Sequence, residues 1–134
     1  MQTKDSSAVP ELVVLDCRQS VADTVARLEN LVATRGLRIF ARIDFAADAA
    51  REGLAMPPMV QLVFGNPRAG TPLLVAAPSI GIDLPLRILV WQEAQGAVRL
   101  AYKDPGALAG QHHAPAELAQ NIAGVRVLAA EASR

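Results

Sequence analysis

Two apolar segments in the second half of the chain follow one another so closely that they restrict the fold. Leu84–Gln92 and Val98–Lys103 have the composition of strands, and Gly96 marks a turn between them. A turn this short joins antiparallel neighbours, so we expect a hairpin. A doubly wound parallel sheet would need more helices between its strands than this chain has. The pattern favours an α+β layer structure with a mainly antiparallel sheet.

The first third of the chain predicts a strand followed by an amphipathic helix. Glu11–Cys17 is short, apolar and β-branched enough for a strand. Ser20 stands three residues before Asp23, which resembles a capping pair. The apolar residues that follow have helical spacing: Val21, Val25, Leu28 and Val32. Gly36 is expected to end this helix as a left-handed cap.

Beyond Gly36 the apolar period changes to two. Four alternating residues predict a strand with one buried face: Leu37, Ile39, Ala41 and Ile43. Asp44 is expected to cap a short alanine-rich helix that ends near Gly53. Pro57 and Pro58 would stop it and precede a strand over Met59–Phe64.

The end of the chain predicts one more helix. Asp104, Pro105 and Gly106 are expected to break off the hairpin, and Pro115 stands at a helix start. One face of this helix would carry Leu118, Ile122 and Val125. The resulting order of strands and helices places helices against an antiparallel sheet.

Composition limits the partners and the location. Thirteen Lys and Arg balance thirteen Asp and Glu in a chain of 134 residues, which disfavours nucleic-acid binding. The sequence shows neither a secretory apolar region nor a stretch long enough to cross a bilayer, so we expect a cytoplasmic protein without membrane contact. Residues 1–10 are expected to form a flexible tail and residues 11–134 a single domain.

The stretch from Gly65 to Pro72, with the sequence GNPRAGTP, is the strongest candidate for a ligand site. Thr71 as N-cap with Pro72 behind it predicts a helix start, whose free N–H groups would face an anion. Gly65 and Gly70 would allow close approach of the backbone, and Arg68 would add a fork of donors. The predicted ligand-binding residues are Gly65, Asn66, Arg68, Gly70 and Thr71, with Asp44 and Asp83 at the rim. The alternative is that these residues only turn the chain.

Other candidate groups point to ordinary structural roles. Asp44, Asp83 and Asp104 stand at element boundaries, where aspartates usually cap or turn the chain. The adjacent His112 and His113 would diverge on a helix, which favours surface histidines over a shared metal. Cys17, the single cysteine, is expected to be a buried thiol. We find no catalytic motif and expect no metal and no cofactor.

Three motifs carry a resemblance to a known family. They are FGNPRAGTP at Phe64–Pro72, GIDLPLR at Gly81–Arg87 and YKDP at Tyr102–Pro105. With them, the chain from Leu15 to His112 resembles the domain of unknown function 302 (DUF302) family. The resemblance implies a TBP-like α+β fold of β-α-β(4)-α order, with one curved antiparallel sheet and helices packed on one face. It also implies a homodimer.

One position departs from the family pattern, and no catalytic role comes with the resemblance. Where the family commonly has Asp-His, this chain has Asp44-Phe45, so any metal or proton-transfer role of that histidine would be lost. Three hypotheses follow: a small-ligand-binding domain at the GNPRAGTP turn, a homodimeric interaction module, and a hydrolase or isomerase with Asp44 or Asp83 as base.

Overall fold

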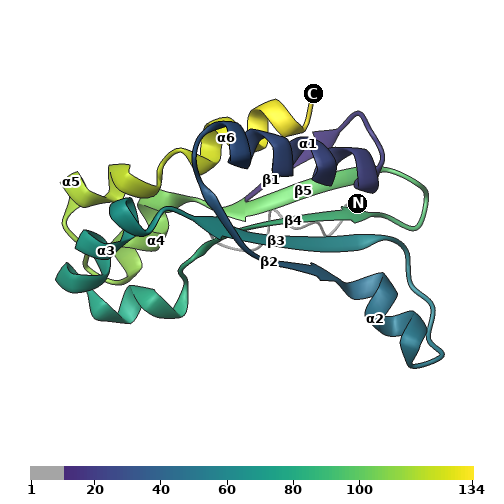
Figure 1. Ribbon diagram of the computed structural model, residues 1–134, viewed down its shortest axis with the longest axis horizontal. Helices are drawn as coiled ribbons and strands as arrows, with labels where there is room; N and C mark the ends of the chain where they lie inside the picture. Colours follow the sequence, from purple (N-terminus) through teal and green to yellow (C-terminus); the bar gives the residue numbers. More distant parts are fainter. Residues whose placement is uncertain (1–10) are drawn as a thin grey trace.

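The described part of the molecule, residues 11–134 of the computed structural model, is built on one antiparallel sheet (Figure 1). The predicted tail at residues 1–10 lies outside the described residues. Five strands pair in the order β1-β5-β4-β3-β2. They are β1 (Leu12–Cys17), β2 (Arg38–Asp44), β3 (Met59–Gly65), β4 (Leu86–Gln92) and β5 (Val98–Lys103). All pairings are antiparallel, which confirms the predicted sheet type and the β4–β5 hairpin.

Two helices lie side by side on one face of this sheet: α1 (Val21–Thr34) and α6 (Val125–Ala132) (Figure 1). The capping pair is confirmed, because the Ser20 hydroxyl accepts a hydrogen bond from the Asp23 N–H at 3.1 Å. Gly36 has φ of 70° and follows the last turn, as the left-handed cap requires. The predicted apolar stripe of α1 faces the sheet, since Val21, Val25, Leu28 and Val32 are all buried.

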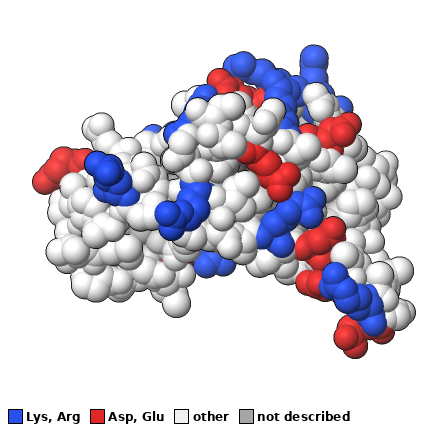
Figure 2. All heavy atoms as spheres, viewed as in Figure 1, with Lys and Arg blue, Asp and Glu red and all other residues white. Residues whose placement is uncertain are grey.

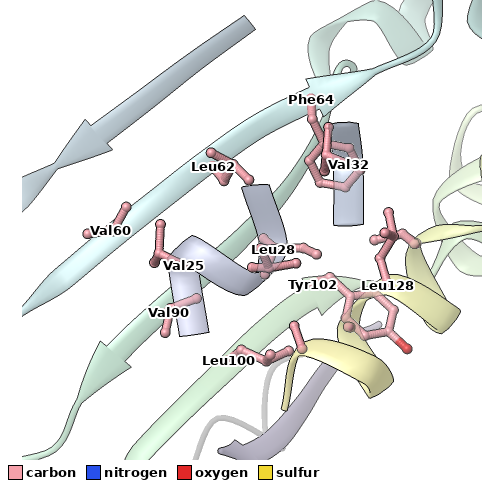
Figure 3. Packing of buried hydrophobic residues seen from close by; sticks show 14 of the residues in the cluster. Val25, Leu28, Val32, Val60, Leu62, Phe64, Val90, Leu100, Tyr102 and Leu128 are labelled. Atoms are coloured by element: carbon pink, nitrogen blue, oxygen red, sulfur yellow. The ribbon is translucent and has the colours of Figure 1, made fainter. Parts of the chain in front are cut away.

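The main core fills the space between these helices and the strands (Figure 3). Val25 and Leu28 of α1 are fully buried. They meet side chains of β3, β4 and β5, among them Val60, Leu62, Val90 and Leu100. Burying one such leucine stabilises the fold by roughly 1.5–3 kcal/mol, so α1 is held mainly by packing.

The predicted buried face of β2 is only partly covered. Leu37, Ala41 and Ile43 are half-buried, but Ile39 is 39% exposed. Phe40, on the face that the alternation leaves open, is 44% exposed. Ile39 pairs with Phe64 and Ala41 with Val63, so the register shifts between them as in a β-bulge. Because β2 is the outer strand of the sheet and a bulge interrupts it at Ile39, the predicted face is half-buried rather than fully buried.

The helices outside the core lie at the two ends of the sheet (Figure 1). At one end α2 (Phe45–Arg51) follows β2, and Asp44 caps it by accepting from the Ala47 N–H at 2.9 Å, as predicted. At the other end lie α3 (Pro67–Ala76), the 3₁₀ helix η2 (Pro78–Ile82) and α4 (Pro105–Gln111). This second end contains the candidate sites.

The segment after β5 differs from its prediction by one added helix, α4. Asp104 caps it and accepts from the Ala107 N–H at 3.0 Å, which confirms the capping role expected of a boundary aspartate. The single helix expected from Pro115 is divided into α5 (Ala116–Ala119), the 3₁₀ helix η3 (Gln120–Ile122) and α6. Gly124 precedes α6, so the weak helix former stands at the division. The strand expected from Leu84 begins two residues later, as β4.

Candidate functional site

The GNPRAGTP turn does enter a helix, but five residues earlier than predicted. Asn66 is the N-cap of α3, and its side-chain oxygen accepts from the Arg68 N–H at 3.0 Å. Pro67 occupies the first helical position, where its missing N–H costs nothing. The prediction of Thr71 as N-cap is therefore wrong: Thr71 lies inside α3, and its hydroxyl donates to the Pro67 carbonyl at 2.6 Å. Two cap-proline pairs compete here, and the earlier one starts the helix.

The first turn of α3 has its backbone donors occupied. Pro67 has no N–H, and the Arg68 N–H is bound by Asn66. The N–H groups of Ala69 and Gly70 donate to the Asn66 carbonyl at 3.0 Å and 2.8 Å. The helix start therefore lacks the free N–H groups on which an anion site would depend. Among the predicted residues, Arg68 supplies the charged donor for an anion, and its side chain is exposed.

A pocket of about 460 Å³ lies beside this turn, between α3, the start of β2, the end of β3 and α6. Its walls are mostly apolar and include Leu37, Phe40, Leu74, Leu86, Val125 and Leu128. Gly65, Asn66, Gly70 and Thr71 also line it, whereas Arg68 does not. The fold thus brings four of the predicted ligand-binding residues together around one apolar cavity.

The polar side chains of the pocket are already paired with protein atoms. Arg35 is the charged residue in its wall within residues 11–134, and its guanidinium lies 2.7 Å from Glu131 of α6. The Asn121 amide donates to the Ala69 carbonyl at 3.0 Å. A pocket with apolar walls and a few polar groups is typical of sites for small organic molecules.

Asp44 and Asp83 do not form a rim around this pocket. The β2–β3 register pairs Arg38 with Gly65 at one end and Asp44 with Val60 at the other, so Asp44 lies at the opposite end of the sheet from the turn. Asp83 does not line this pocket but a second hollow, of about 500 Å³, together with Ile82 and Arg87. The two carboxylates therefore belong to different parts of the molecule.

Asp83 is the centre of a second group of polar side chains. One of its oxygens lies 2.7 Å from Nε2 of His112, and the other lies 3.3 Å from Nζ of Lys103. The second ring nitrogen of His112, Nδ1, lies 2.8 Å from the Ser79 hydroxyl. The His112 side chain is only 14% exposed, so the prediction that it is a surface histidine is wrong. Ser79 carries no sequence signal for this contact, since 33 residues separate it from His112.

The surroundings of Asp83, Asp104 and Cys17 shift the pKa values of these side chains. The hydrogen bond from His112, with help from Lys103, lowers the pKa of Asp83. Burial raises the pKa of Asp104, but hydrogen bonds from the Ala107 N–H and from Arg126 outweigh it and lower the value overall. Burial raises the pKa of the Cys17 thiol, which favours its protonated form, although the residue is half-buried and not fully buried as predicted. Within residues 11–134, His, Cys, Asp and Glu side chains form no group of three that could hold a metal ion.

Among known proteins, part of two longer curated proteins is similar in sequence to this chain. The protein named fluoride-specific ion channel FluC 1 of Brucella suis biovar 1 is 41% identical over 101 residues, which are 75% of this chain and 40% of that protein. The FluC 1 protein of Brucella abortus biovar 1 is also 41% identical over 101 residues, 75% of this chain and 37% of that protein. The chain thus spans less than half the length of these curated relatives. None of the helices within residues 11–134 has the length and hydrophobicity needed to cross a membrane.

A solved structure and a family model cover nearly the whole domain. The crystal structure of an uncharacterized conserved DUF302 protein from Bacillus stearothermophilus superposes with a TM-score of 0.75 at 22% identity, and the match covers 93% of this chain and 97% of that one. This likeness shows the fold. The model of the family described as domain of unknown function DUF302 matches residues 13–129. This chain belongs to the DUF302 family.

Proposed function

We propose that this domain binds a small, mainly apolar molecule in the pocket at the start of α3. The observation that carries the proposal is a cavity of about 460 Å³ with apolar walls beside the GNPRAGTP turn. Its volume is typical of ligand pockets. Gly65, Asn66, Gly70 and Thr71 would form the side of the pocket nearest to the turn. The part of the molecule built by α3, α4 and α5 also carries few charged side chains on the face shown in Figure 2.

The charges around the pocket support an apolar ligand over a small free anion. Glu131 neutralises Arg35, and the α3 N–H groups are occupied by Asn66. A carboxylate on an otherwise apolar ligand could still share the Arg35 guanidinium, which has five N–H donors. The competing proposal is a small anion held by Arg68 outside the pocket. It predicts that an inorganic anion such as phosphate binds, and that substitution of Arg68 abolishes the binding.

A thermal-shift series with dodecanol, dodecanoate and inorganic phosphate separates the two proposals. Gly70 has no atom within 4 Å of the place where its Cβ would lie, so Gly70→Leu should extend into the pocket and block it. Gly70→Ala is the control for the backbone, and Arg68→Ala is the control outside the pocket. A ligand at 100 times its Kd stabilises the folded state by about 2.7 kcal/mol.

We expect one or both dodecyl compounds to raise the melting temperature of the unmodified protein, of Gly70→Ala and of Arg68→Ala, but not of Gly70→Leu. Stabilisation by dodecanoate but not by dodecanol would assign Arg35 to the carboxylate. Stabilisation by phosphate that disappears in Arg68→Ala, with no effect of either dodecyl compound, would contradict the apolar site and support the anion site.

A second candidate function, a homodimeric interaction module, rests on the face of the sheet opposite α1 and α6. Val60, Leu62, Ile88 and Val90 are buried under the helices, so their neighbours in the strands face the other way. Met59 pairs with Trp91 and Gln61 with Leu89 on this other face, where Met59, Leu89 and Trp91 are half-buried. A half-covered apolar sheet face is a surface on which two copies could pack.

Sedimentation velocity over a range of protein concentrations tests this candidate. We expect the unmodified protein to sediment as a dimer and Leu89→Glu to sediment as a monomer, because the new charge would have to be buried in the interface. Val127→Glu, on an exposed position of α6, is the matched control and should remain dimeric. A monomer at all concentrations would contradict the dimer proposal and leave the pocket proposal untouched.

A further inference from the structure

Three side chains that are distant in sequence form a continuous line of hydrogen bonds at the second group described above. The Ser79 hydroxyl lies 2.8 Å from Nδ1 of His112, and Nε2 of the same ring lies 2.7 Å from an Asp83 oxygen. Ser79 lies on η2 and is exposed, whereas His112 is largely buried behind it. The outermost group of the line is therefore a hydroxyl that a solute can reach.

The carboxylate selects the form of the imidazole that can act as a base. An ionised carboxylate only accepts hydrogen bonds, so Nε2 must carry the proton that points to Asp83. The neutral ring then has its lone pair on Nδ1, where it accepts from the Ser79 hydroxyl. Lys103, at 3.3 Å from the other Asp83 oxygen, keeps the carboxylate ionised and in place. Nucleophile, base and orienting group are thus in the order that general-base activation of a serine needs.

We propose that Ser79 is an activated nucleophile that accepts acyl groups from small esters, with His112 as its general base and Asp83 as the residue that positions His112. The site is separate from the pocket at the start of α3. The ring is used in the opposite sense to the common serine hydrolases, since Ser79 meets Nδ1 and the carboxylate meets Nε2.

The reaction consumes only the ester and one water molecule. The Ser79 oxygen attacks the ester carbonyl carbon, its proton moves to Nδ1 of His112, and the carbonyl re-forms as the alcohol or phenol departs with that proton. The products are an acyl ester on Ser79 and the free alcohol. Water then attacks this ester, with Nδ1 again taking the proton and returning it to the Ser79 oxygen, which releases a carboxylic acid.

An exposed apolar side chain on the same 3₁₀ helix favours a small apolar acyl group: Ile82, three residues after Ser79, is 77% exposed. Asp83 and Ile82 line the hollow of about 500 Å³, whereas Ser79 and His112 do not, so a substrate reaches the exposed Ser79 from the surface. A small ester with a good leaving group, such as an acetyl ester, is therefore a suitable probe.

The test uses p-nitrophenyl acetate with the full chain. Release of p-nitrophenolate reports the rate, and mass spectrometry of proteolytic peptides reports which residue carries the acetyl group. The variants are Ser79→Ala, His112→Gln and Asp83→Asn. Ser133→Ala and His113→Gln are matched controls, because the Ser133 hydroxyl donates to the Ala130 carbonyl and His113 is exposed beside His112.

We expect acetylation of Ser79 in the unmodified protein and in both controls. His112→Gln should slow it by about 100-fold or more, since general-base catalysis contributes about 10²–10⁴-fold. Asp83→Asn should slow the acetylation of Ser79 and leave the acetylation rates of other residues unchanged. A general loss of structure would change those rates as well. If Ser79 in the unmodified protein is acetylated no faster than Ser133, the proposal is overturned, whether or not the variants fold. An equal rate in a folded His112→Gln variant would overturn it as well.

Discussion

The start of α3 predicts that alanine substitutions at two polar residues five positions apart, Asn66 and Thr71, affect the free energy of unfolding differently. In Asn66→Ala, the Arg68 N–H loses its side-chain acceptor at 3.0 Å. Replacing an N-cap by alanine costs about 1 kcal/mol, with a range of about 0.5–2 kcal/mol. Thr71 lies inside the helix, where alanine is the better helix former by up to about 0.7 kcal/mol. The Thr71 hydroxyl bond to the Pro67 carbonyl is exposed, so its loss should not reverse this gain.

We therefore expect Asn66→Ala to be about 1 kcal/mol less stable than the unmodified protein, and Thr71→Ala to be equal or slightly more stable. Urea unfolding, followed by the fluorescence of the single tryptophan, Trp91, measures both. With a slope of roughly 1–3 kcal/mol per molar urea, a loss of 1 kcal/mol lowers the midpoint by about 0.3–1 M. Asn66→Asp is the control, because it keeps an oxygen at the cap and should preserve stability. A loss of about 1 kcal/mol in Thr71→Ala, with no loss in Asn66→Ala, would refute the helix start at Asn66.

Three further variants test the core, a cap and an ionised group. Leu28→Ala should cost about 2–5 kcal/mol, since Leu28 is fully buried between α1 and the sheet, and the same urea titration measures the loss; Val127→Ala, on the exposed side of α6, should have little effect. Gly36→Ala should cost about 1–2 kcal/mol, because φ of 70° is unfavourable for any residue with a Cβ; Gly70→Ala, in a helix with φ in the ordinary range, should instead be neutral or stabilising, and an equal loss in both would contradict this reasoning. The pKa of Asp83 lies below its ordinary value of 3.8, so its ionised form stabilises the fold above that pH and this stabilisation is lost as the pH falls through the folded-state pKa. Urea midpoints measured between roughly pH 2 and pH 6 should therefore fall less steeply for Asp83→Asn than for the unmodified protein, and identical slopes would show that Asp83 has no such role.

The elements that the sequence predicted well are those decided by neighbouring residues. The start of α1 needs only a hydroxyl three residues before a free N–H, as at Ser20, and its end needs only a residue that tolerates positive φ, as at Gly36. The hairpin between β4 and β5 needs only a short turn. The family resemblance, carried by three short motifs, agrees with the match over residues 13–129.

Errors arose where two local signals competed or where exposure depended on the neighbours of a strand. Asn66-Pro67 and Thr71-Pro72 both have the form of a helix start, and only the first of these pairs starts a helix. The alternation in β2 was genuine, but a bulge and an outer position left Ile39 exposed and the rest of its face only half-buried. Local chemistry lists the possible starts and faces, and packing selects among them.

The amino-acid sequence by itself determined the antiparallel hairpin and the caps of α1 and α2, because each depends on contacts within a few residues. The order of strands and helices along the chain indicated the α+β class, and three short motifs indicated the family. Only the tertiary structure decided what surrounds the candidate groups. It placed Asn66 and Gly70 in the wall of an apolar pocket and left Asp44 at the far end of the sheet. It also brought Ser79 and Asp83 to His112, across 33 and 29 residues of chain. Contacts of this kind follow from how helices close over the ends of a sheet, which no local pattern specifies.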